Sequence, residues 1–120
     1  MKVKIISVHG HGDYDKEYVY LQALEDADIG HYVLADSTYN SNGTVSNKVR
    51  HTYWFPDGIV KKGSYISLWT KPGKSSVSNS NGKTIHHYYW GLKEAVWNDE
   101  GDCAVLLEIG AWQAHRAKGK

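Results

Sequence analysis

Short runs of β-branched and aromatic residues alternate with turn-forming residues along the whole chain. This pattern is typical of β-strands joined by tight turns. We expect strands at residues 2–8, 16–24, 31–36, 47–55, 64–70, 84–91 and 102–109, with a shorter one near 111–115. One segment, residues 91–97, has the composition for a single helical turn. The pattern therefore predicts an all-β fold, a sandwich or a small barrel of short strands.

Apolar and polar residues alternate with period two inside two of these runs, and this alternation assigns each side chain to a face. The face that we expect to be buried holds Val19, Leu21, Ala23, Ile66 and Leu68. The opposite face holds Tyr18, Tyr20, Tyr65 and Trp69. The alternation thus predicts aromatic side chains on the outside of the sheet.

Two segments lack the apolar content that a core needs. Residues 75–82 read Ser-Ser-Val-Ser-Asn-Ser-Asn-Gly, and such a composition predicts a mobile loop inside the domain. Residues 115–120 are basic and are expected to form a frayed tail. A chain of 120 residues has the length of one domain, so we take residues 1–120 as a single domain.

The net charge of the chain does not identify a class of binding partner. Fourteen Lys and Arg against 13 Asp and Glu leave a formal charge of +1, far from the basic excess that drives non-specific nucleic-acid binding. The single cysteine, Cys103, excludes an internal disulfide and a cysteine-based zinc cage, and it fits a reducing compartment. With no signal-peptide core near the start and no long apolar run, we expect a cytoplasmic protein without a membrane contact.

Several motifs along the chain resemble one known family. Residues 52–56 read Thr-Tyr-Trp-Phe-Pro and are followed by Ile-Val-Lys-Lys-Gly at 59–63 and Ile-Ser-Leu-Trp at 66–69. Later come Tyr-Tyr-Trp at 88–90 and Val-Trp-Asn-Asp-Glu-Gly-Asp-Cys-Ala-Val-Leu at 96–106. Glu-Tyr-Val-Tyr-Leu at 17–21 and Gly-His-Tyr-Val-Leu-Ala-Asp at 30–36 agree more loosely.

In this order the motifs resemble the tail domain of nuclear lamins and its stand-alone bacterial relatives. The resemblance runs from about Val3 to Ala114. It implies an immunoglobulin-like β-sandwich of about eight or nine short strands. The shared residues read mostly as structural ones: the Trp side chains would fill the space between two sheets, and Phe55 with Pro56 would end a strand at a corner.

The sharpest local chemistry lies at residues 9–15, where imidazole and carboxylate groups alternate. In an extended segment His9, His11, Asp13 and Asp15 would point the same way, and zinc, manganese or nickel accepts such ligands. One hypothesis is therefore a metal-assisted hydrolase with its site at His9 and His11. The two glycines indicate a flexible loop, so they favour the alternative hypothesis, a solvated connection between strands that binds no metal.

Other catalytic motifs find little support. Cys103 lies among apolar residues on a strand that we expect to be buried, where a thiol behaves as a small hydrophobe. No Ser stands in a Gly-x-Ser-x-Gly setting, and the glycines near residue 10 precede no helix that could hold a phosphate. We therefore expect a protein that is not an enzyme and needs no cofactor.

Two kinds of binding remain open. Nucleic-acid binding would use the basic tail residues Arg116, Lys118 and Lys120 together with exposed aromatic rings. Protein binding would use an excess of aromatics, nine Tyr, five Trp and one Phe, of which Tyr18, Tyr20, Tyr65 and Trp69 are the candidate contact residues. The same rings could instead form ladders that stabilise the sheet, and both roles can hold together. We favour an adaptor module with a protein partner, acting as a monomer or weak homo-oligomer.

Overall fold

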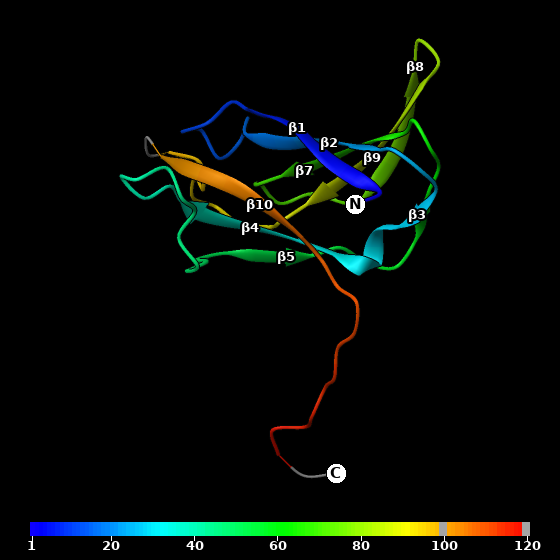
Figure 1. The fold of residues 1–120 in the computed structure, drawn as a ribbon. Coiled ribbons are helices and arrows are strands. Elements are labelled where there is room, and N and C mark those ends of the chain that lie inside the picture. Colours follow the sequence, from blue (N-terminus) through cyan, green and yellow to red (C-terminus); the bar gives the residue numbers. More distant parts are fainter. Residues whose placement is uncertain (99–100, 119–120) are drawn as a thin grey trace.

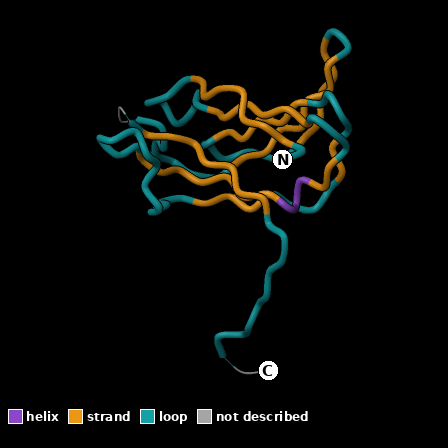
Figure 2. Tube along the Cα trace, in the orientation of Figure 1, coloured by secondary structure: helices purple, strands orange, loops and turns teal. Residues whose placement is uncertain are grey.

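The computed structural model describes residues 1–98 and 101–118, which form strands, loops and one short 3-10 turn. The strands are β1 (Val3–His9), β2 (Tyr18–Ala23), β3 (Ala27–Asp28), β4 (Tyr32–Thr38), β5 (Thr52–Trp54), β6 (Ile59–Val60), β7 (Tyr65–Trp69), β8 (Ser76–Ser80), β9 (Lys83–Tyr89) and β10 (Asp102–Glu108), and the 3-10 turn η1 is Ile29–His31. Figure 2 shows that the regular structure of the described chain consists of strands and one short helical turn, joined by loops. The predicted all-β fold is confirmed. None of the described residues belongs to a helix with the length and apolar character that crossing a bilayer requires.

The larger layer is a five-stranded sheet with the order β1-β2-β7-β9-β8. Its neighbours pair antiparallel except for β7 and β9, which run parallel. The second layer is a three-stranded antiparallel sheet with the order β10-β4-β5, and Figure 1 shows it lying below the first sheet. A small two-stranded sheet joins β3 and β6. Two packed layers of this kind make a β-sandwich.

The core lies between the two layers. Leu21 and Ile66 of the larger sheet meet Leu34 of the smaller one, and Phe55 and Trp97 fill the space beside them. Each fully buried aliphatic side chain of this kind stabilises the fold by roughly 2 kcal/mol. The inward face predicted from the alternation is confirmed, since the exposed fractions are at most 1% for Val19, Leu21, Ala23, Ile66 and Leu68.

An irregularity in β1 decides where its last residue points. The pairing with β2 shifts between Ile5 and Ser7, so that Ile6 is an extra residue and is 43% exposed. Such a bulge reverses the alternation that follows it. As a result Val8 lies opposite the buried Val19, and His9 lies opposite Tyr18 on the outer face of the sheet.

The segment predicted as a mobile loop, residues 75–82, is a strand and a turn instead. β8 pairs with β9 over five residues, from the Ser76 and His87 pair to the Ser80 and Lys83 pair. Asn81 and Gly82 join the two strands with φ angles of 51° and 77°. Asn-Gly in this left-handed geometry is the preferred two-residue hairpin connection. The local turn signal thus outweighs the polar composition, because β8 is an edge strand whose side chains need little burial.

Three further expectations differ from the structure. The strand predicted at 47–55 is confined to Thr52–Trp54, because the hydroxyl of Ser37 lies 2.8 Å and 2.7 Å from the carbonyl oxygens of Ser46 and Lys48 and holds that segment as a loop. No strand forms at 111–115, where the exposed chain leaves the sheet. Cys103 is only partly buried, because it points to the outer side of the three-stranded sheet, and burial still raises its thiol pKa.

Candidate binding surface

A row of four rings crosses the outer side of the five-stranded sheet. Strand register places His9, Tyr18, Trp69 and Tyr89 on β1, β2, β7 and β9 in line with one another. The ring centroids are 4.7 Å apart for His9 and Tyr18, 4.4 Å for Tyr18 and Trp69, and 6.5 Å for Trp69 and Tyr89. Cross-strand aromatic pairs at such distances stabilise a sheet. The row is therefore a ladder built into the fold.

A second aromatic pair extends the row along the strands. The rings of Tyr20 and Tyr65 are parallel within 3° with centroids 5.0 Å apart. Tyr20 also meets the edges of Tyr18 and His9, both at 6.3 Å. The structure thus brings the four aromatics predicted from the sequence, Tyr18, Tyr20, Tyr65 and Trp69, into one contiguous and partly exposed array. We call the array, with His9 and Tyr89, the aromatic face.

Two lysines lie over the rings at opposite ends of β7. The ammonium of Lys71 is 4.9 Å from the ring centroid of Trp69, and that of Lys83 is 5.4 Å from the ring centroid of Tyr65. Both distances are those of cation–π contacts. Because these two rings also stack on a neighbouring ring, their π-faces are occupied. Trp69 therefore offers its ring edge to a partner, and Tyr65 offers its ring edge and hydroxyl group.

A chain of hydrogen bonds lies between the two lysines. The two ring nitrogens of His87 lie 2.7 Å from Ser67 Oγ and 2.8 Å from Ser78 Oγ, and the indole N–H of Trp69 donates to Ser67 Oγ at 3.1 Å. Burial lowers the pKa of His87, which favours the neutral ring. The sequence places His86 and His87 on opposite faces of a strand, but it does not reveal these serine partners, which come from two other strands.

The charged side chains within the strands of the larger sheet are all basic. None of the five strands of the larger sheet, all of them described in the structure, contains Asp or Glu, whereas Lys4 and Lys83 stand in β1 and β9. In a neighbouring loop, a carboxylate oxygen of Asp15 lies 4.0 Å from Lys71 Nζ in a partly exposed pair. The aromatic face is therefore suited to a partner with negative charge.

The loop at residues 9–15 does not gather its candidate ligands. His9 Nε2 lies 2.6 Å from Ser7 Oγ and its ring stacks on Tyr18, while Asp13 accepts from the backbone N–H of Asp15. His11 is exposed, and among residues 1–98 and 101–118 no three His, Cys, Asp or Glu side chains are grouped to hold a metal ion. The chain turns here because Gly10 has a φ of 62° and packs so tightly on the Lys16 carbonyl that a Cβ atom would clash.

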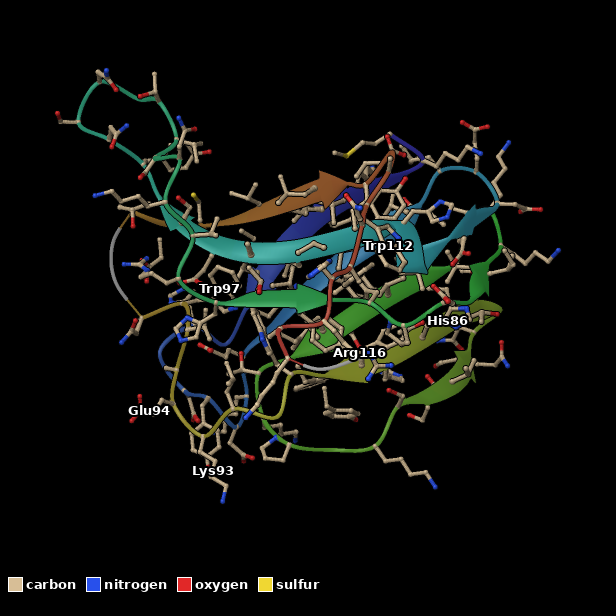
Figure 3. All side chains as sticks on the ribbon, turned by 90° about the horizontal axis from the view of Figure 1, so that it is seen from below. His86, Lys93, Glu94, Trp97, Trp112 and Arg116 are labelled. Carbon is tan, nitrogen blue, oxygen red and sulfur yellow. The ribbon has the colours of Figure 1, made fainter. Side chains whose placement is uncertain are left out.

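The basic tail lies on the other side of the molecule. Figure 1 shows the C-terminal segment leaving below the three-stranded sheet, away from the five-stranded one, and Figure 3 shows Trp112 and Arg116 from that side. Trp112 packs edge to face on Trp54 at 5.1 Å, and Arg116 and Lys118 are exposed. Lys120 lies outside the described residues. The tail and the aromatic face therefore do not form one surface.

An ionic cluster with two buried carboxylates holds the loop after β4. Asp36 accepts from Arg50 Nε at 3.1 Å and from the His51 backbone N–H at 2.6 Å, and its side chain is 2% exposed. Arg50 also donates to Asp102 at 2.8 Å. These residues come from separate segments of the chain, so no local sequence motif predicts the cluster. Both carboxylates accept from charged donors, an arrangement that fixes a loop in place.

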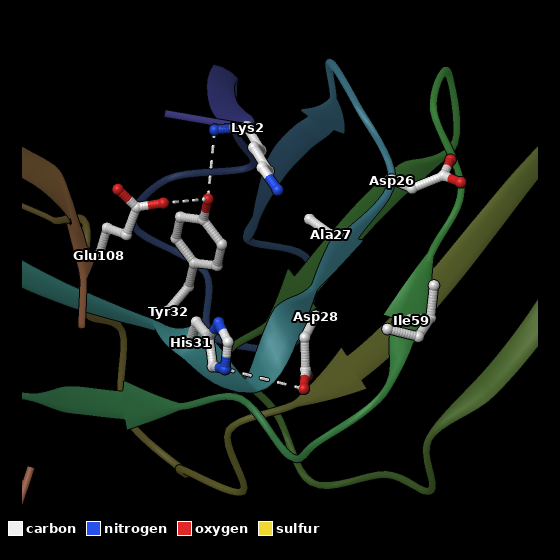
Figure 4. A pocket seen from close by; sticks show the side chains of 8 residues that line it. All are labelled: Lys2, Asp26, Ala27, Asp28, His31, Tyr32, Ile59 and Glu108. Atoms are coloured by element: carbon white, nitrogen blue, oxygen red, sulfur yellow. Dashed lines mark hydrogen bonds and ion pairs between the residues drawn. The ribbon is translucent and has the colours of Figure 1, made fainter. Parts of the chain in front are cut away.

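A surface pocket of about 290 Å³ lies at the start of β4. Its lining residues, drawn in Figure 4, are Lys2, Asp26, Ala27, Asp28, His31, Tyr32, Ile59 and Glu108. The hydroxyl of Tyr32 donates to Glu108 at 2.8 Å and accepts from the backbone N–H of Lys2 at 3.2 Å. Backbone N–H groups of Gly58 and Gly30 lower the pKa of Asp28. These contacts tie the chain start to β4 and β10, which is a structural role.

Comparison of the chain with models of protein families and with curated proteins found no match.

Proposed function

We propose that this protein is a binding module without catalytic activity, an adaptor that holds a protein partner on its aromatic face. One observation carries the proposal: the four candidate rings of β2 and β7, together with His9 and Tyr89, form a single contiguous, partly exposed array across four strands. Tyr and Trp dominate binding hot spots, because they offer large contact areas at a small cost in side-chain entropy. A sheet that fixes its rings by stacking them also presents a preorganised surface.

The packing of the rings favours a protein over a nucleic acid. Single-stranded nucleic acids bind by stacking bases on free aromatic faces. Tyr18 lies between His9 and Trp69, and Tyr65 lies between Tyr20 and Lys83, so these rings have no open face for a base. The basic tail is also on the opposite side from the rings, which separates the two elements that a nucleic-acid site would combine.

We also propose that the sandwich is an immunoglobulin-like domain of the lamin-tail type. In support, the residues that carry the resemblance include core side chains, since Phe55 is 2% and Trp97 is 4% exposed. A crystal structure superposed on a lamin tail domain tests this, and a different strand order would contradict it. We further propose that the adaptor acts in the cytoplasm, a reducing compartment in which the single, partly buried Cys103 stays a free thiol.

Site-specific crosslinking in cells of the source organism tests the proposed function. A photoreactive phenylalanine analogue replaces Tyr65, on the aromatic face, or Trp112, on the opposite side. We expect a discrete protein adduct from position 65 and none of the same mass from position 112. The Tyr65→Ser variant should compete poorly for that partner, whereas the Trp112→Ser variant should compete like the wild type.

Some crosslinking results would contradict the proposal. Adducts of the same mass from both positions, or an adduct confined to position 112, would place the contact surface elsewhere. Thermal unfolding of each variant shows that it is folded before its crosslinks are compared.

A further inference from the structure

Two lysines cover the rings at the two ends of the outer side of β7. Tyr65 and Trp69 are four residues apart on this strand, about 13 Å for an extended chain. Lys83 lies over the first ring and Lys71 over the second. The two ammonium groups thus mark the ends of a stretch that is four residues long.

Polar groups fill the middle of the stretch. Ser67 lies halfway between the two rings on β7 and belongs to the hydrogen-bonded chain with His87 and Ser78. The side chain of Ser67 is covered, since the residue is 2% exposed, whereas His87 and Ser78 are partly exposed. A ligand along β7 therefore meets a charge, then hydrogen-bonding groups, then a second charge.

No negative charge in the sheet competes for the lysines. The five strands contain no Asp or Glu, and all of these strands are described. Lys71 does face Asp15, but the two groups are 4.0 Å apart and the Asp15 side chain is 66% exposed. Ion pairs this exposed are weak. A ligand carboxylate can therefore replace Asp15 at little cost.

We propose that the aromatic face binds an extended acidic segment of a protein, with carboxylates four residues apart. This inference rests on the proposed function and names the chemistry of the partner. In an extended chain the side chains of residues i, i+2 and i+4 share one face. Carboxylates at i and i+4 reach Lys83 and Lys71 together, and an odd spacing turns one of them away from the sheet.

Two peptides of equal composition test the spacing. The first contains Glu-Thr-Leu-Thr-Glu and the second Glu-Thr-Leu-Glu-Thr, each flanked by Gly and Ser and blocked at both ends. Each is titrated into the ¹⁵N-labelled full chain, and amide shifts are followed by NMR. We expect the first peptide to shift amides of β7 and β9 and to bind at least threefold more tightly than the second.

Charge removal tests the lysines. Lys83→Gln and Lys71→Gln should each weaken binding of the first peptide about threefold, and the double variant about tenfold, because single exposed ion pairs contribute little. A matched control removes the same charge elsewhere, in Lys93→Gln with Lys118→Gln, and should bind like the wild type. Affinity should also fall as salt rises from about 50 to 300 mM.

The outcomes separate this inference from the proposed function. If both peptides bind equally, if neither shifts β7 and β9, or if the Lys71 and Lys83 variants bind like the wild type, the acidic-segment proposal is wrong. A crosslink from position 65 that persists in such a case leaves the proposed function standing. If an eight-residue oligothymidine shifts the same amides at lower concentration than either peptide, the partner class is wrong and both proposals fall.

Discussion

The carboxylate of Glu17 accepts a hydrogen bond of 2.7 Å from Thr70 Oγ1, and both residues are fully buried. The same carboxylate also accepts from the backbone N–H groups of Val96 at 2.5 Å, Gly12 at 3.2 Å and Trp97 at 3.4 Å. One side chain thereby joins the turn after β1, the end of β7 and the segment that follows β9. A buried carboxylate satisfied by several donors is a strong structural clamp.

Replacement of Glu17 is therefore expected to destabilise the fold strongly. Glu17→Gln turns an amide NH₂ toward backbone donors and should lower the free energy of unfolding by about 2 kcal/mol. Glu17→Ala leaves the donors unpaired beside a cavity and should lower it by about 4 kcal/mol. Urea unfolding measures both. The exposed Glu25→Gln is the control and should stay within about 0.5 kcal/mol of the wild type, and a similar result for Glu17→Gln would contradict the clamp.

Sequence periodicity predicts the parts of this fold that burial controls. The inward positions of β2 and β7 follow from alternation alone, because a strand with one face in the core must alternate. Alternation does not predict the bulge at Ile6, which directs His9 to the outer face. It also does not predict the contacts of Glu17, since its donors come from residues 12, 70, 96 and 97 and become neighbours only in the folded chain.

Tyr18 and Trp69 should stabilise the sheet as a pair. Their rings face each other across β2 and β7 with centroids 4.4 Å apart. A double-mutant cycle with Tyr18→Ala and Trp69→Ala should give a coupling energy of about 1 kcal/mol. The control cycle pairs Tyr18→Ala with Trp112→Ala, whose ring packs on Trp54 on the other side of the molecule, and should be additive within about 0.5 kcal/mol. Equal coupling in both cycles would show that the rings do not act as contacting neighbours.

Protonation of His87 should oppose folding. Burial lowers the pKa of His87, and burial together with the charge of His87 lowers that of His86, whereas an unfolded histidine has a pKa of about 6.5. As the pH falls below about 6.5, the unfolded chain therefore takes up protons before the folded chain does. The free energy of unfolding should decrease as the pH falls from about 6.5 toward the lower pKa of the folded state. We expect the His87 ring resonances to titrate below pH 6.5 in NMR spectra.

The urea midpoint provides the second measurement of this effect. Between pH 7.5 and 5.5 the midpoint should fall less in a His86→Gln, His87→Gln double variant than in the wild type. His115→Gln changes a histidine on the exposed tail and should keep the fall of the wild type. A His87 titration above pH 6.5, or an equal fall in all three proteins, would contradict the assignment of a buried neutral ring.

The candidate site illustrates what composition can and cannot predict. Outward aromatics on β2 and β7 follow from alternation, but their contacts with Lys71 and Lys83 depend on the segment that leaves β7 and on the turn that leads into β9. Lys83 follows the Asn81–Gly82 turn and pairs with Ser80, so pairing with the strand at residues 76–80 helps to fix its position over Tyr65. A mobile loop there would leave this part of the aromatic face without its lysine.

The β8 and β9 hairpin supplies the last prediction. Amides of β8 that pair with β9 should exchange with deuterium at least 100-fold more slowly than in an unstructured chain, because opening them requires separation of the two strands. Gly82→Ala forces a Cβ onto a residue with a φ of 77° and should destabilise the hairpin by about 1 kcal/mol, so that β8 exchange rises about fivefold. Gly58→Ala is the control: a Cβ there meets open space at an ordinary φ, and β8 exchange should not change. Exchange of the wild-type β8 amides at unstructured rates would mean that the polar composition, and not the Asn-Gly turn, decides the state of this segment.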